Sequence, residues 1–174
     1  MIPKVDLDDS EILKAGKFLA SFIVAFSVLG FLLSLIPLIA IEFLFAAPTL
    51  EILKFFGFGG MLNADAEPVL IVLQKIAMPI SISYLCTGIL EVAIIAAAII
   101  SSFGIQMKKR ILGVAVSIIA IAAFNLFRIV ASILIILWFG LDAGEFSHDL
   151  LFRIFLFVVI AGFYFVWFRW ATKH

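Results

Sequence analysis

The fold is decided by the stretch ILGVAVSIIAIAAFNLFRIVASILIILWF at residues 111–139, in which Arg128 is the only charged side chain. An α-helix crosses the hydrocarbon core of a membrane, about 30 Å thick, with about 20 apolar residues. The stretch therefore predicts a membrane-spanning helix that exceeds the membrane by about nine residues. We expect the excess, residues 132–140, to project beyond Arg128 as a wall facing an outer loop.

Three other stretches are long and apolar enough to cross a membrane, at residues of about 18–41, 86–105 and 150–168. The second of these is interrupted only by Glu91. The sequence therefore predicts an all-α membrane protein. We expect one integral membrane domain over residues 1–174, built as a bundle of four transmembrane helices.

The composition agrees with this prediction and excludes other classes of protein. Hydrophobic residues make up 66% of the chain, whereas soluble domains contain about 45–50%. The 12 basic and 12 acidic residues cancel, and a nucleic-acid-binding domain needs a basic excess. Because Cys86 is the single cysteine, no intrachain disulfide can form.

The basic residues outside the predicted spans are unevenly distributed. One side of the membrane receives eight of them: Lys4, Lys14, Lys17, Lys108, Lys109, Arg110, Arg169 and Lys173. The other side receives only Lys54 and Lys75, together with most of the acids. Because cytoplasmic loops carry the excess of Lys and Arg, both termini are predicted to be cytoplasmic in a multi-pass protein of the cell membrane. We expect residues 1–16 to form a short interfacial helix on that side.

The long outer loop, residues 42–85, predicts structure of its own. Residues 42–58 mix large apolar side chains with charges, which is typical of a helix lying in the membrane interface. Residues 68–85 alternate β-branched and polar side chains, which favours an extended or hairpin element. A fifth span is rejected there, because Gln74 and Lys75 would lie at mid-membrane. A flexible connection is expected between the two elements, at Gly57, Gly59, Gly60 and Asn63.

Three polar residues in different predicted helices lie at one depth. The basic clusters mark the cytoplasmic boundary, and a helix rises about 1.5 Å per residue. This count places Cys86 about 33 Å, Arg128 about 27 Å and His148 about 31 Å above that boundary. All three are expected at the outer edge of the hydrocarbon core.

Each of these residues has an ordinary structural interpretation. A lone cysteine often acts as a small hydrophobic side chain, an arginine near a helix end often reaches lipid phosphates, and a histidine at a helix start can be interfacial. Together they form a set for acyl transfer. Cys86 is a candidate nucleophile, His148 its acid/base partner and Arg128 the stabiliser of an oxyanion. No zinc-type ligand cluster and no nucleotide-binding motif occurs, so no metal or other cofactor is expected.

Four further residues are candidates for a supporting role. Asn125 precedes Arg128 by one helical turn and is expected to orient the guanidinium or to pair across helices. Glu91 lies about 7.5 Å below Cys86 and could pair with Arg128 or Asn125, stay protonated, or serve as a structural hydrogen-bond partner. Thr87 and Gly88 follow the cysteine, and Gly88 would allow close approach of helices.

At these residues the sequence resembles the exosortase/archaeosortase family of membrane transpeptidases. The family's motifs are a cysteine followed by Ser or Thr and Gly, an Asn-x-x-Arg, and a late histidine. They match Cys86-Thr87-Gly88, Asn125-Leu126-Phe127-Arg128-Ile129 and His148-Asp149, in that order. The matching region covers about residues 84–170. Family members often have more spans, and Ala commonly stands where this chain has Leu85, so the chain looks like a minimal version.

The resemblance implies a function and partners. Such enzymes cleave the C-terminal sorting signal of exported proteins, which consists of a short motif, a transmembrane helix and a basic tail. They act on the outer membrane face, and the archaeal members are thought to pass the new C-terminus to a membrane lipid. The resemblance implies Cys86 as the nucleophile, Arg128 as the transition-state stabiliser and His148 as the acid/base.

Two hypotheses of other classes stand beside the enzyme. The polar residues Glu91, Arg128 and His148 could line a small transport or proton path through the bundle. This reading predicts polar positions down to the cytoplasm, whereas residues 93–100 and 112–124 are apolar apart from Ser117. The third hypothesis is a non-catalytic assembly or lipid-binding subunit, in which Cys86 would be inert.

Overall fold

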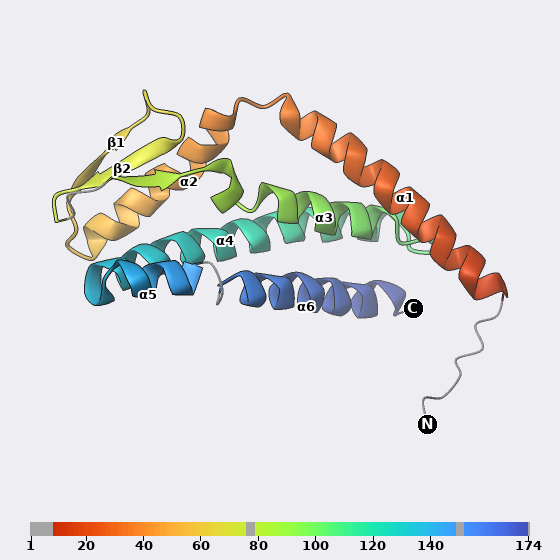
Figure 1. Ribbon diagram of the computed structural model, residues 1–174. Coiled ribbons are helices and arrows are strands. Elements are labelled where there is room, and N and C mark those ends of the chain that lie inside the picture. Colours follow the sequence, from red (N-terminus) through yellow and green to blue (C-terminus); the bar gives the residue numbers. More distant parts are fainter. Residues whose placement is uncertain (1–8, 76–78, 149–151, 174) are drawn as a thin grey trace.

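A computed structural model of the chain describes residues 9–75, 79–148 and 152–173. Helices dominate, and a small sheet lies at the end of the molecule where α4 meets α5 (Figure 1). The elements are α1 (Asp9–Ser34), α2 (Leu38–Phe55), β1 (Gly60–Asn63), β2 (Val69–Leu73), β3 (Ile80–Ile82), the 3₁₀ turn η1 (Tyr84–Cys86), α3 (Ile89–Ile100), α4 (Met107–Phe139), α5 (Leu141–Phe146) and α6 (Phe152–Thr172).

Three described helices are long and apolar enough to cross a membrane: α1, α4 and residues Ile154–Thr172 of α6. The predicted bundle of four spans is not confirmed, because the expected helix over residues 86–105 is not continuous. It is replaced by η1, a left-handed residue at Gly88 and then α3, whose 12 residues cover only about 18 Å. The prediction of a largely helical membrane protein holds, and that of a continuous second span is wrong.

The first span also differs from its predicted bounds of 18–41. Helix α1 begins at Asp9 and includes residues 9–16, which we had expected to form a separate interfacial helix; residues 1–8 lie outside the described part. The helix ends at Ser34, and Pro37 precedes α2 with ψ at 127°, a non-helical value. Because proline lacks the backbone donor and fixes its own φ, the apolar run is divided between two helices. None of the side chains of α1 is buried, and the helix lies along α3 (Figure 1).

The outer segment is more ordered than the sequence suggests. The interfacial helix predicted at 42–58 is α2, which begins four residues earlier. The extended element predicted at 68–85 is confirmed as β2 and β3, in an antiparallel sheet of order β1-β2-β3. The expected flexible connection is partly wrong, because Gly60 to Asn63 form β1. At Gly60 a Cβ would overlap the Val72 carbonyl oxygen, so the residue allows the two strands to approach.

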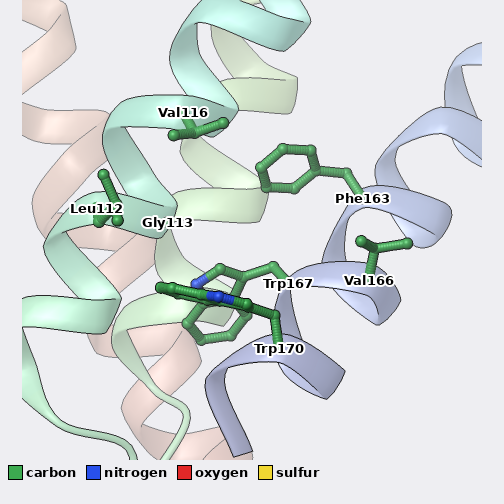
Figure 2. A pocket seen from close by; sticks show the side chains of 7 residues that line it. All are labelled: Leu112, Gly113, Val116, Phe163, Val166, Trp167 and Trp170. Atoms are coloured by element: carbon green, nitrogen blue, oxygen red, sulfur yellow. The ribbon is translucent and has the colours of Figure 1, made fainter. Parts of the chain in front are cut away.

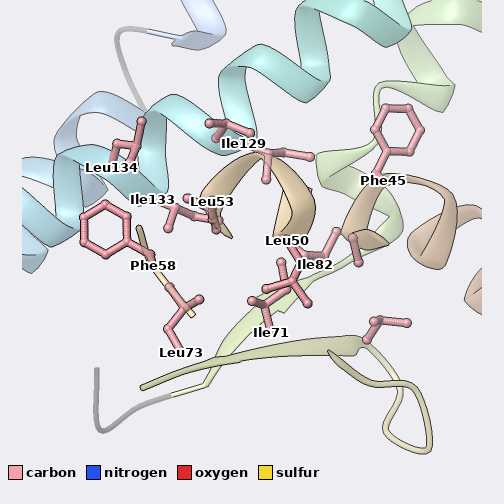
Figure 3. Packing of buried hydrophobic residues seen from close by; sticks show 13 residues of the cluster. Phe45, Leu50, Leu53, Phe58, Ile71, Leu73, Ile82, Ile129, Ile133 and Leu134 are labelled. Atoms are coloured by element: carbon pink, nitrogen blue, oxygen red, sulfur yellow. The ribbon is translucent and has the colours of Figure 1, made fainter. Parts of the chain in front are cut away.

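One hydrophobic core joins α2, the sheet and the Phe139 end of α4. Figure 3 shows the α2 side chains lying between the sheet and α4. The main members are Phe45, Leu50, Leu53, Val69, Ile71, Leu73, Ile82, Ile129, Val130, Ile133 and Leu134. The wall predicted for residues 132–140 is thus confirmed: the last turns of α4 face the outer segment, in which α2 packs between α4 and the sheet.

The opposite end of α4 is closed by α6. Gly113 lets the indole of Trp167 approach the helix, where a Cβ would overlap the ring, and the indole donates a hydrogen bond to the Lys109 carbonyl (3.2 Å). A cavity of about 240 Å³ lies here, and Figure 2 shows Phe163, Trp167 and Trp170 of α6 turned toward it. Its lining contains no titratable or nucleophilic side chain, so this cavity has no groups for catalysis.

Candidate active site

Cys86 is held in a short turn between the sheet and α3. The chain leaves β3 at Ile82 and forms η1, in which the Cys86 backbone N–H donates to the Ser83 carbonyl (2.9 Å). The Thr87 hydroxyl donates to the Tyr84 carbonyl (2.6 Å) and closes the same turn. Cys86 is half-buried, with its sulfur 3.5 Å from the Ser83 hydroxyl. The nucleophile candidate therefore lies before α3 and outside the three candidate spans.

Glu42 anchors this turn from α2, and the sequence analysis missed its role. Its side chain is 3% exposed, and its two carboxylate oxygens accept hydrogen bonds from the backbone N–H groups of Val69 and Tyr84, each at 3.0 Å. One buried carboxylate thus joins α2, β2 and η1. The sequence contains a signal for this role, because Glu42 is the single charged residue between Ser34 and Leu50. A carboxylate within such an apolar stretch requires hydrogen-bond partners if it is buried.

Arg128 reaches the same place from α4. The residue is 5% exposed, and its Nη2 lies 3.4 Å from Nε2 of His148. The guanidinium Nε is buried and has no hydrogen-bond partner among the described residues. A buried arginine retains its charge, so the guanidinium places a fixed cation with unused donor capacity at this site.

His148 arrives because the chain reverses after α4. Gly140 has φ at +93°, a left-handed conformation that favours glycine, and α5 then runs back along α4 (Figure 1). The two helices are close enough that a Cβ on Gly144 would overlap the Ile136 side chain. Ser147 and His148 continue α5 as a wider turn, which brings the imidazole back to Arg128. The connection between α4 and α6 is thus partly helical; Asp149 lies outside the described residues.

The three predicted catalytic side chains lie together in the structure. Burial of the Cys86 thiol raises its pKa, but hydrogen bonds from His148 and Ser83 and the charges of His148 and Arg128 outweigh burial, so that the pKa falls from 9.0 to about 7. The thiolate, which is the nucleophilic form, is therefore well populated near neutral pH. Cys86, Arg128 and His148 together line a cavity of about 400 Å³, closed on its far side by Leu156, Phe157 and Ile160 of α6. We call it the Leu156 cavity.

Asn125 and Gly88 form one contact between α4 and the start of α3. Gly88 has φ at +77°, and a Cβ there would overlap the Asn125 amide nitrogen. The amide donates to the Ile121 carbonyl of its own helix (3.0 Å), and its oxygen is buried without a hydrogen-bond partner among the described residues. Of the two roles expected for Asn125, contact across helices is observed, and a hydrogen bond to the guanidinium is not observed among the described residues. Gly88 allows close approach, as predicted.

The other two supporting candidates differ in position. Thr87 is buried and bonds within its own turn, so it shapes the turn and does not line the Leu156 cavity. Glu91 lines that cavity beside Arg128, but no ion pair or hydrogen bond joins Glu91 to another described residue, so the pairing expected with Arg128 or Asn125 is not observed. The carboxylate lies in the first turn of α3, where the helix dipole favours a negative charge.

The donor set at this site suits covalent acyl chemistry. A thiol with a lowered pKa contacts an imidazole, and the imidazole contacts a buried guanidinium, which is the order needed for a nucleophile, a proton carrier and an oxyanion donor. In the described part of the chain, no group of three or more His, Cys, Asp or Glu side chains is arranged to hold a metal ion.

Comparisons with known proteins return no match: no protein-family model, no curated protein and no solved structure is similar to the chain.

Proposed function

We propose that the protein is a membrane-embedded cysteine transpeptidase. It cleaves a C-terminal segment from exported proteins and transfers the new C-terminus to an acceptor, for which a membrane lipid is the leading candidate. The observation that carries the proposal is the meeting of Cys86, His148 and Arg128, which come from η1, the end of α5 and α4. The resemblance to the exosortase/archaeosortase family rests on the same three residues and adds the class of substrate.

The proposed reaction begins with the Cys86 thiolate. It attacks the scissile carbonyl, and the guanidinium of Arg128 donates hydrogen bonds to the oxyanion that forms. His148 gives a proton to the leaving amine as the C–N bond breaks, which leaves a thioester on Cys86. The acceptor, a hydroxyl or an amine, then attacks the thioester, loses its proton to His148 and releases the thiolate.

The Leu156 cavity supports entry of the substrate from within the membrane. Its far wall belongs to α6, a candidate span, and Leu85, Leu90 and Phe157 in its lining are exposed apolar side chains. A substrate helix in the bilayer therefore approaches the cysteine sideways. The distribution of basic residues favours cytoplasmic termini, and with that orientation the site at the Phe139 end of α4 faces the outside of the cell.

The experiment measures processing of surface proteins in host cells that carry Cys86→Ala, Arg128→Ala or His148→Ala in place of the wild-type chain. Each variant is expected to accumulate uncleaved protein in the membrane. The matched controls are Arg169→Ala, which removes an exposed arginine, and His174→Ala, which removes the only other histidine; both are expected to process normally. Undiminished processing by Cys86→Ala would refute the thiol mechanism.

A further inference from the structure

We propose that a second cavity, on the other side of Cys86 and His148, is the pocket that selects the substrate. It would bind one short, uncharged side chain with a hydroxyl or amide tip, from a residue next to the scissile bond. The inference rests on the proposed function and adds to it the chemical class of the residue recognised. We call this space the Ser132 cavity, after the residue that carries the argument.

The Ser132 cavity connects directly with the reacting groups. Its lining contains Cys86 and His148, so whatever fills it lies against the thiol and the imidazole. Ile80 and Ile82 come from β3, and Ile133 and Ile136 come from the last turns of α4. The sheet and the α4 wall, which are held together by the core in Figure 3, thus form two sides of the cavity.

Size and polarity restrict the occupant. The volume is about 210 Å³, below the range of about 300–1,000 Å³ typical of sites for whole small-molecule ligands. A cavity of this size takes a single side chain of a larger molecule. Five of its ten lining residues are isoleucines, which disfavours a charged group. Glu145 in the lining disfavours an anion further.

Ser132 supplies the second, independent observation. The residue is 4% exposed, and its hydroxyl is buried with no hydrogen-bond partner among the described residues. Ser117, another buried serine of α4, instead donates to the Val114 carbonyl of its own helix (2.8 Å). Because a buried polar group without a partner is costly, the free hydroxyl in this cavity indicates a partner that arrives with the substrate.

The position of Ser132 agrees with that role. It follows Arg128 by four residues and therefore lies one turn further along the same face of α4. The guanidinium would hold the oxyanion at the scissile carbonyl, and the hydroxyl would meet the side chain of a residue close by. A site built to pair with a substrate hydroxyl or amide rejects the apolar analogue strongly, so Ser132 would determine specificity.

The test uses a host surface protein whose processing depends on Cys86. Each residue near its cleavage site is changed in turn to Thr, Val and Trp. In the wild-type enzyme, one position is expected to prefer Thr over both Val and Trp by about tenfold or more. Ser132→Ala should abolish the preference for Thr over Val at that position, and Ile136→Ala should enlarge the cavity and restore processing of the Trp substrate by about tenfold.

The control variant is Ile135→Ala, which removes the same side chain from the neighbouring position of α4, outside the cavity lining. It should leave the size preference unchanged. If Ile136→Ala fails to fold, as judged by thermal unfolding, Ile80→Ala on the opposite wall gives the same measurement. If processing depends on Cys86, but Ser132→Ala and the enlarged variant both keep the substrate preferences of the wild type, the pocket proposal is overturned and the proposed function stands. Processing that does not depend on Cys86 overturns the proposed function, and the pocket with it.

Discussion

Replacing His148 with glutamine should change how the reactivity of Cys86 depends on pH. His148 is the strongest of the groups that lower the pKa of the thiol, and burial opposes it. Glutamine has a similar size and removes the titratable ring. The pKa of Cys86 should therefore rise from about 7 toward its ordinary value of 9.0, while Ser83 and Arg128 still favour the thiolate.

The size of the effect follows from two opposing changes. At pH 7, a pKa of about 7 leaves about half of the thiol as thiolate, and a pKa of 9.0 leaves about 1%. The thiolate of a thiol with pKa 9.0 is, however, about 6- to 10-fold more reactive than that of a thiol with pKa about 7, for a Brønsted coefficient of about 0.4–0.5. The net loss of rate at pH 7 is therefore up to about 5- to 8-fold. The sign reverses at about pH 8, and above it His148→Gln should react faster than wild type.

The assay is alkylation of the purified protein by iodoacetamide between pH 5 and 10, followed by intact-protein mass spectrometry. Because Cys86 is the single cysteine, every adduct reports on it and no other thiol has to be removed. His174→Gln is the matched control and should follow the wild-type profile. Superimposable profiles for wild type and His148→Gln would refute the contact between His148 and the thiol as the cause of the lowered pKa.

Further predictions concern the residues that position the site. Glu42→Gln replaces one of the two oxygen atoms that accept backbone hydrogen bonds with a donor, so it should lower the free energy of unfolding by about 1.5–3 kcal/mol and slow processing. The control variant Glu51→Gln, at an exposed position, should do neither. Equal thermal stability of the two variants would contradict the anchoring role of Glu42. Gly88→Ala should cost about 1–2 kcal/mol for the left-handed backbone and about 1–3 kcal/mol more for the overlap with Asn125. Gly104→Ala, with φ at +79° and open space around it, should show only the first cost in denaturant unfolding, so equal losses would refute the Gly88–Asn125 contact.

Sequence patterns predicted the structure correctly where a single physical effect dominates. The apolar length of α4 and the apolar wall beyond Arg128 follow from the cost of polar groups in lipid, and both are found in the structure. The depth count also predicted that Cys86, Arg128 and His148 lie near one another, although its value for Cys86 assumed a continuous helix that the structure does not contain. The alternation of isoleucine and serine from Ile80 to Ser83 correctly predicted an extended chain at β3.

Other features depend on contacts that a pattern does not contain. The start of the second span was predicted three residues too early because Gly88 adopts a left-handed conformation against Asn125, a tertiary contact that hydropathy does not record. The first span was predicted to continue to residue 41, beyond the end of α1 at Ser34, because hydropathy alone ignores the missing donor of Pro37. The anchoring role of Glu42 was not predicted, since its two backbone partners lie 27 and 42 residues away. The Ser132 cavity needs the reversal at Gly140, which folds α5 back onto α4.

The most direct test of the central claim is to identify the bond formed on the substrate when hydroxylamine is the acceptor. If Cys86 forms a thioester, hydroxylamine resolves it, and mass spectrometry of the processed surface protein should show a C-terminal hydroxamate with the wild-type enzyme and no cleavage with Cys86→Ala. A C-terminal carboxylate formed at equal rates by both proteins, with no hydroxamate, would contradict covalent catalysis by this cysteine.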